Sequence, residues 1–199
     1  MKNYYIITLF TLLFFSCESI VFDDDEKKID LIRTGFTLYK NEKYDLAEET
    51  FKLALATGTV VRKDTALTGL GFTQIRLYKL DSALVHLDNA LTLNPTMSEA
   101  LYAKMILYYA YKKDYSIAID LGNRIISNDP NWMFLYDNTS NIKDVYLHLA
   151  LSEFELQHYV QSYEFTQKIS SKILDPNASN FTSELAKLHS ELSIELKAN

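Results

Sequence analysis

Small side chains recur at one register of this chain, and they constrain its fold more than any other feature. Four equivalent positions carry Ala, Ala, Ala and Ser, and successive members lie 36, 35 and 44 positions apart. Two helices joined by a tight turn would bring these positions close to the residues twelve positions earlier, and small side chains there let the helices approach closely. The four positions are Ala47, Ala83, Ala118 and Ser162, and the earlier ones are Gly35, Gly71, Ile106 and Ala150.

Residues 67–95 show the helical pair most clearly, with a tight turn at residues 78–81 and Pro95 after the second helix. Each of the two predicted helices carries apolar or small residues on one face, and the larger of these would fill the space around the close contact. They are Leu67, Leu70 and Gly71 on the first helix, and Ala83, Leu87, Ala90 and Leu91 on the second.

The composition agrees with one helical domain. The chain has 199 residues, of which 48% are hydrophobic and 23% charged, and only 5 Gly and 3 Pro, too few for an all-β protein rich in turns. The formal net charge of −6 argues against a nucleic-acid partner. A single Cys excludes an intramolecular disulfide.

The N-terminus predicts an export signal. Residues 4–15 form an uncharged run behind Lys2, too short for the roughly 20 apolar residues of a bilayer span but as long as the core of a signal peptide. Cys17 follows at once, and residues 13–17 resemble the lipobox of bacterial lipoproteins. The resemblance implies that residues 1–16 are a lipoprotein signal peptide, that Cys17 is acylated, for example by palmitate, and that the membrane partner is reached through this lipid anchor. The expected location is the bacterial cell envelope, at the outer membrane. The alternatives are an ordinary secretory signal and a short membrane anchor.

Residues 17–28 are acidic, with four consecutive acids at positions 23–26. Such a run repels itself and cannot pack in a core. We interpret the segment as a solvated tether between the lipid and the domain. The alternative is a sorting signal, because an acidic run just after the Cys is similar to that of surface lipoproteins in some Gram-negative bacteria.

The repeated pair resembles the tetratricopeptide repeat, TPR, a helix–turn–helix unit of 34 residues. The resemblance implies an all-α, right-handed α-α superhelix, a TPR solenoid, of about four helix pairs plus a C-terminal capping helix. The domain would span residues 29–199, with repeats at 29–61, 64–97, 99–131 and 143–176 and the capping helix at 181–198. The features that stay in register are the small residues above, the turn residues Tyr44, Leu80, Tyr115 and Tyr159, and the terminators Gly58, Pro95, Pro130 and Pro176.

Local signals refine this pattern. Asp45 with Glu48, and Thr96 with Glu99, have the spacing of a capping box. In the third repeat a bulky Ile106 stands at the position of Gly35, while a Gly stands at the position that faces it, an exchange that would conserve volume between the helices.

Residues 131–141 interrupt the period by about ten residues and carry three aromatic side chains, Trp132, Phe134 and Tyr136. Insertions of this kind map to loops in solenoids, often on the binding face. The aromatic residues either bind a ligand or fold back over the adjoining groove. We favour the second interpretation, because an exposed cluster of this kind would promote aggregation.

If the resemblance holds, the first helices of each pair line a concave groove that binds a protein or peptide. Helical phase places seven residues on it, and several of them could instead be buried between neighbouring repeats. The expected groove residues are Phe36, Tyr39, Phe72, Arg76, Leu107, Tyr111 and Phe154.

No catalytic motif is visible. The four His residues lack metal-ligand spacing, and no phosphate-binding glycine loop is present, so we expect no enzymatic activity, no cofactor and no metal site. The sequence therefore predicts a non-catalytic scaffold for protein–protein interaction, anchored by lipid in the bacterial envelope. The alternative is a carbohydrate-capture lipoprotein, or an accessory subunit of an envelope enzyme complex, in which Trp132 and its neighbours face sugar rings.

Overall fold

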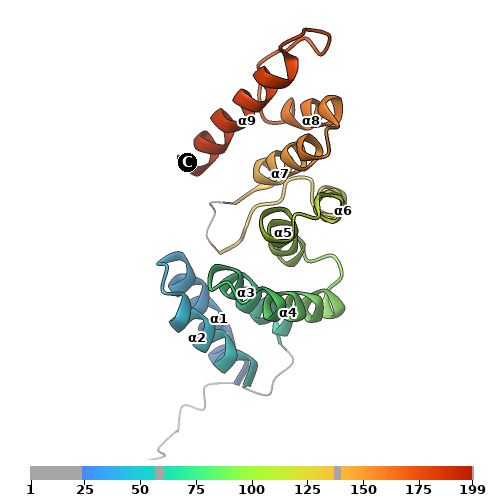
Figure 1. Ribbon diagram of the computed structural model, residues 1–199. Coiled ribbons are helices and arrows are strands. Elements are labelled where there is room, and N and C mark those ends of the chain that lie inside the picture. The colour runs from blue at the N-terminus through green and yellow to red at the C-terminus, as the bar shows by residue number, and fades with distance from the viewer. Residues whose placement is uncertain (1–23, 57–60, 137–139, 199) are drawn as a thin grey trace, which may run out of the picture.

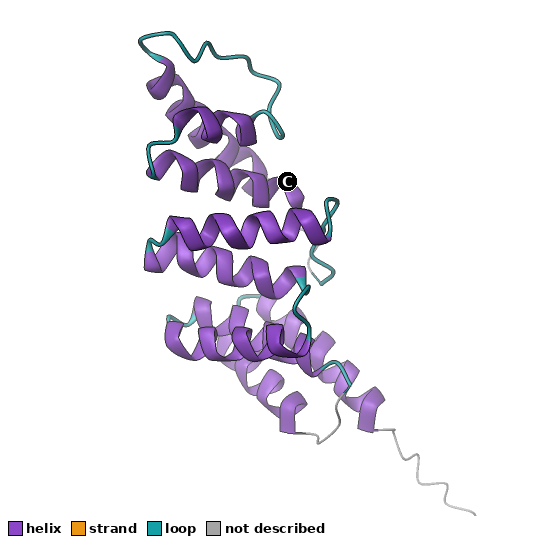
Figure 2. Ribbon diagram, turned by 90° about the vertical axis from the view of Figure 1, so that its right-hand side faces the viewer, coloured by secondary structure: helices purple, strands orange, loops and turns teal. Residues whose placement is uncertain are grey.

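The computed structural model describes residues 24–56, 61–136 and 140–198. This part of the chain contains nine α-helices, stacked so that their axes cross the long axis of the molecule (Figures 1 and 2). Four antiparallel pairs follow one another, and a long helix ends the stack. The helices are α1 Asp24–Lys40, α2 Tyr44–Ala56, α3 Lys63–Arg76, α4 Leu80–Leu93, α5 Ser98–Leu107, α6 Tyr115–Asn128, α7 Ile142–Glu155, α8 Tyr159–Thr166 and α9 Phe181–Ala198.

Close approach of the helices depends on glycine, as the sequence pattern predicts. A Cβ atom at Gly35 would lie 2.7 Å from the ring of Phe51, and one at Gly69 only 2.3 Å from the same ring. The Phe51 side chain of α2 is therefore held between glycines of α1 and α3. Gly71 receives Leu87 of α4 in the same way, and Ala47 and Ala83 are fully buried. These contacts require small residues, so the predicted pairing of the helices is confirmed.

The turn inside each repeat has one conformation. Five residues before each small residue the backbone is left-handed, and none of the four residues is Gly. In three repeats the next N–H donates to the carbonyl five residues earlier, as from Lys43 to Leu38 at 2.9 Å, which satisfies a carbonyl at the helix end. The left-handed residues are Glu42, Tyr78, Lys113 and Gln157.

The third repeat corrects one prediction. Its first helix ends in a π-helical segment, η1 Tyr108–Lys112, and the turn bond from Asp114 reaches back six residues to Tyr108. This extra residue rotates the preceding helix, so Met105, rather than Ile106, is fully buried. Gly122 faces Met105 and also Leu149 of the next repeat. Counting from the turn could not reveal this one-residue shift.

Helix boundaries differ from the prediction at two places. α1 begins at Asp24, so it includes the last part of the predicted tether at residues 17–28, whose earlier part lies outside the described residues. α8 ends at Thr166, ten residues before Pro176, and an irregular connection leads from there to α9 (Figure 1). α9 itself matches the predicted capping helix.

The predicted capping boxes are absent. Glu48 turns away from its own helix start toward α3 and α4, and α5 has no side-chain cap, because Thr96 donates to Asn94 instead. A capping box does form at α7, between Asn141 and Asp144.

One apolar core runs from α1 to α7, and α9 packs on the end through two smaller clusters. Leu188 and Leu192 of α9 contact Leu147 of α7, while Phe181 and Leu185 contact Tyr163 of α8. Among the described residues, no helix has the length and apolarity needed to cross a bilayer.

Candidate functional site

The connection between α6 and α7 loops out beside α5 (Figure 1), and its side chains contact residues of α1, α3 and α5. Residues 131–136 and 140–142 form a short hairpin, in which Phe134 N–H donates to Ser140 O at 2.8 Å and Ile142 N–H donates to Trp132 O at 2.8 Å. Because side chains alternate along an extended chain, residues 132, 134 and 136 point one way and residues 133 and 135 the other. The inner rings of Trp132 and Phe134 are buried, whereas Met133 and Leu135 are 58% and 65% exposed.

Each inner aromatic residue of the hairpin contacts a different repeat. Trp132 packs on Tyr102 of α5, with ring centroids 4.7 Å apart, and Phe134 packs on Phe72 of α3 at 5.1 Å. Tyr136 stacks on a ring of α1 at 4.0 Å and 11°, and its hydroxyl accepts a hydrogen bond from Arg62 at 3.2 Å. The α1 ring is that of Phe36. The hairpin therefore fills the groove across three repeats, and the prediction that these aromatic residues cover the groove is correct.

A polar cleft of about 570 Å³ lies beside the hairpin, at the starts of α3 and α5. Its acidic residues are Asp64, Glu99 and Asp129. Burial raises the pKa of Glu99, and the neighbouring Trp132 side chain acts in the opposite direction and lowers this pKa. The indole Nε1 of Trp132 is buried and makes no hydrogen bond of normal geometry with the described residues.

The structure separates the seven predicted groove residues into four that other parts of the protein cover and three that remain accessible. Phe36 and Phe72 lie on the first helices of their pairs, but the hairpin covers them, and they are only 3% and 5% exposed. Leu107 is fully buried in the core rather than on the groove, because of the rotation caused by η1. Phe154 is half-buried and lies against His189 of α9, which packs on the end of the stack.

The remaining three predicted residues, Tyr39, Arg76 and Tyr111, lie where α1, α3 and η1 end. Here they meet two residues that the phase argument did not single out, Tyr44 and Tyr78. The Arg76 guanidinium lies 5.1 Å from the centre of the Tyr44 ring, and Tyr78 meets Tyr111 edge to face at 5.8 Å. We call these five residues the tyrosine cluster.

The tyrosine cluster is accessible. Arg76 is exposed and Tyr78 is 76% exposed, while the other three rings are half-buried. Burial alone would lower the pKa of Arg76, but the neighbouring phenol groups of Tyr39 and Tyr44 outweigh it and raise this pKa. The cluster therefore presents a fixed positive charge framed by aromatic rings.

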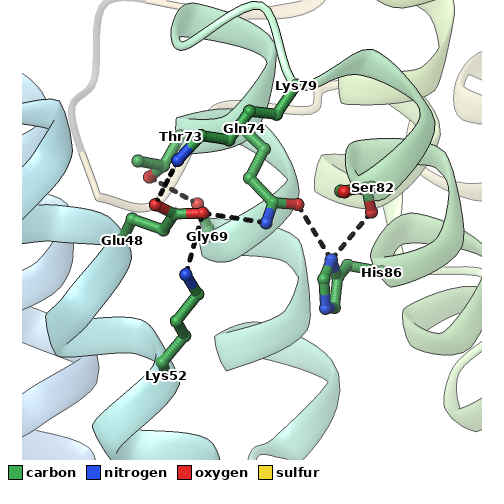
Figure 3. Close-up of polar contacts among 8 residues, drawn as sticks. All are labelled: Glu48, Lys52, Gly69, Thr73, Gln74, Lys79, Ser82 and His86. Atoms are coloured by element: carbon green, nitrogen blue, oxygen red, sulfur yellow. Dashed lines mark hydrogen bonds and ion pairs between the residues drawn. The ribbon is translucent and has the colours of Figure 1, made fainter.

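A polar network on α2, α3 and α4 holds this region in place (Figure 3). Glu48 accepts hydrogen bonds from Gln74 at 3.1 Å and Lys79 at 2.7 Å, and it also pairs with Lys52. Gln74 Oε1 in turn lies 2.8 Å from His86 Nδ1. Burial alone would raise the pKa of Glu48, but these donors lower it to about 2. The network joins the first two repeats close to Arg76 and Tyr78.

Comparisons with known proteins identify the fold. No family model matches the chain, and no curated protein matches its sequence. Among solved structures, a MamA mutant superposes with a TM-score of 0.59 at 15% identity, over 86% of this chain and 91% of the other. A tetratricopeptide repeat protein from Parabacteroides merdae gives 0.60 at 18% identity, over 86% of this chain and 63% of the other, so this chain spans less than two thirds of that protein. A TPR protein in Thermus thermophilus gives 0.54 at 18% identity, over 85% and 86%.

The fold is a tetratricopeptide-repeat solenoid. Its right-handed stack of four TPR pairs and a terminal helix confirms the predicted fold class. In this TPR solenoid the hairpin covers residues of α1, α3 and α5, α9 packs on the end of the stack, and the tyrosine cluster is exposed between the ends of the first helices. The described residues contain no group of three or more potential metal ligands.

Sequence reasoning missed the tyrosine cluster as a unit. Tyr78 was assigned to a turn, and Tyr44 to the register of turn residues, so neither was assigned to the groove. A signal existed, because Tyr44 and Tyr78 flank the ends of the helices that carry Tyr39 and Arg76. The carbohydrate hypothesis loses its support, since Trp132 and Phe134 are only 2% exposed and face the protein interior.

Proposed function

We propose that this protein is a non-catalytic TPR scaffold that binds a protein or peptide through the tyrosine cluster. The observation that supports this proposal is the exposed Arg76 framed by aromatic side chains on the otherwise covered face of the first helices. Tyr and Arg dominate the binding energy of protein interfaces, because they combine large contact areas with directional hydrogen bonds. Arg also pairs well with carboxylate groups through its planar fork of donors.

In-cell photo-crosslinking tests this proposal. A photoreactive residue at position 78 should give a discrete crosslinked product, and Arg76→Ala in the same chain should reduce its yield several-fold. The matched control is position 85 on α4, where Val85 is 58% exposed. Equal products from both positions, or none from position 78, would refute the assignment of the site.

We further propose that the scaffold is held in the bacterial cell envelope, at the outer membrane, by lipid on Cys17. This residue lies outside the described part of the chain, and the proposal rests on its position directly after a short apolar run. Acyl chains contribute about 0.8 kcal/mol per buried CH₂, and one chain alone holds a protein only marginally, so stable attachment needs at least two.

Metabolic labelling with a fatty-acid probe tests the anchor. The parent should incorporate the probe and fractionate with membranes, whereas Cys17→Ser should do neither. Labelling that persists in Cys17→Ser, or a parent that never labels, would contradict the lipid anchor but leave the scaffold proposal intact.

A further inference from the structure

The hairpin occupies the groove as a bound peptide would. It is extended, and it places one aromatic ring on each of three consecutive repeats, in the order α5, α3, α1 as the chain advances. Its outer residues, Met133 and Leu135, are exposed, so the hairpin forms a single layer over the groove.

The rings beneath the hairpin also contact residues of the helices. Phe36 of α1 packs edge to face on Phe51 of α2 at 4.9 Å, and Phe72 of α3 contacts Tyr102 of α5 at 6.5 Å. The glycine contacts that pair the helices, such as that of Gly71 with Leu87, also lie away from it. The rings that the hairpin covers are therefore also held by the helices that carry them.

The hairpin fits this groove imperfectly. The indole N–H of Trp132 is buried beside the Glu99 carboxyl and makes no hydrogen bond of normal geometry with the described residues. A buried donor left wholly unsatisfied costs about 1–3 kcal/mol, and a poorly satisfied one costs part of that. A ring without a polar hydrogen at this place would avoid that cost. A competing segment with such a ring at the Tyr102 position therefore avoids a cost that the hairpin carries.

We propose that the hairpin is an internal occupant of the groove, and that a partner segment displaces it. The partner segment is extended and carries aromatic side chains at three alternate positions, because these are the spacings at which the rings of Tyr102, Phe72 and Phe36 receive Trp132, Phe134 and Tyr136. This inference rests on the proposed function as a protein-binding scaffold. It adds a second contact surface for the partner, beneath the hairpin, and states which side chains the partner needs there.

The chain contains its own reporter, since Trp132 is the single Trp. The probe is a synthetic peptide of residues 130–136 carrying Trp132→Phe, with a lysine tail for solubility. Added to the full chain, it should produce a saturable red shift of the Trp132 emission as the hairpin moves into water. Tyr136→Ala removes the stack on Phe36 and the hydrogen bond from Arg62, so the hairpin is held less tightly. The peptide concentration that gives half of the red shift should therefore fall about tenfold in this variant.

The control peptide has the same composition, with the residues at positions 133 and 134 exchanged so that the rings no longer alternate. It should leave the emission unchanged. Circular dichroism with the bound peptide should retain the helical signal, which separates displacement from unfolding. No shift in either chain, an equal shift with the control peptide, or loss of helix would overturn the inference. None of these results alters crosslinking at position 78, so the scaffold proposal is tested independently.

Discussion

Among the described residues, five that are not Gly hold a left-handed backbone that Gly would adopt more easily. For an L-residue this conformation costs about 1–2 kcal/mol, because Cβ approaches the following carbonyl oxygen. The residues have φ between 52° and 64° with Arg62 included, and four of them terminate the first helix of a repeat. The chain retains these side chains, and one of them, Tyr78, belongs to the tyrosine cluster. That site therefore contains backbone strain that a glycine turn would not have.

Gln157 offers the simplest test of this strain, since it is exposed and has φ of 64°. We expect Gln157→Gly to stabilise the protein by about 0.5–1 kcal/mol, because relief of the strained backbone exceeds the entropic cost of Gly. Thermal unfolding followed by circular dichroism measures the effect. Gln161→Gly, at an exposed position inside α8, should destabilise it, and a loss of stability in both variants would contradict the assignment of strain.

Gly69 shows how tightly the residues pack. Its Cβ position lies 2.3 Å from the Phe51 ring, which is itself fully buried between two helices. Gly69→Ala should therefore destabilise the fold by about 1–3 kcal/mol through overpacking. Urea titration checks this value, and Gly69→Ala combined with Phe51→Leu should recover part of the loss. An unchanged midpoint for the single variant would show that the ring can move aside.

At the scale of elements, the sequence predicts helices well where small residues and terminators recur, and poorly where long-range contacts decide. α9 has the same range as the predicted capping helix, because its apolar stripe is regular. The rotation of α5 depends on η1, and no composition signal marks that extra residue. Glu48 has the spacing of a capping box, yet Gln74 and Lys79 of the next repeat bind it more favourably.

The candidate site was also predictable only in part, because local periodicity is visible in the sequence and long-range contacts are not. Helical phase finds Tyr39, Arg76 and Tyr111 because they lie on the first helices. It also finds Phe36 and Phe72, but whether these side chains are exposed to solvent depends on the path of the hairpin. That path is set by contacts between residues far apart in the sequence, which periodicity does not encode.

The attachment of α9 depends on a buried His189. Its Nε2 lies 2.8 Å from Thr166 Oγ1, and the Thr166 hydroxyl donates to Ser162 O, so Nε2–H donates to Thr166. Nδ1 is buried and makes no hydrogen bond to the described residues, which disfavours a second proton on the ring. Burial lowers the pKa of His189 from 6.5 to about 4. Between these values the unfolded chain takes up a proton that the folded protein does not, so stability is complete above pH 6.5 and falls toward pH 4.

We expect His189→Gln to remove this dependence while keeping a donor to Thr166. From pH 7 to pH 5 the parent should lose stability relative to the variant, at up to about 1.4 kcal/mol per pH unit. Urea midpoints of both chains across this range provide the measurement. Parallel curves would mean that His189 titrates alike in the folded and unfolded states.

At the scale of the whole molecule, α9 acts as the terminal cap that a solenoid needs for solubility. Its leucines cover Leu147 of α7, and this cluster is separate from the core that contains the hairpin. A chain that ends at residue 180 should therefore self-associate through the uncovered apolar face. Light scattering should detect this, whereas Trp132 emission should stay as in the parent. A monodisperse truncated chain would show that α9 is dispensable.

The hairpin also changes how the molecule carries mechanical load. In a simple solenoid each repeat touches only its neighbours, so a pull on one end is transmitted repeat by repeat. Here Tyr136 contacts Phe36 of the first helix and Arg62, 74 positions away. A lipid-tethered N-terminus would pull on α1, and the hairpin would transfer part of that force directly to the connection between α6 and α7. The hairpin thus ties the first helix of the solenoid to the middle of the stack.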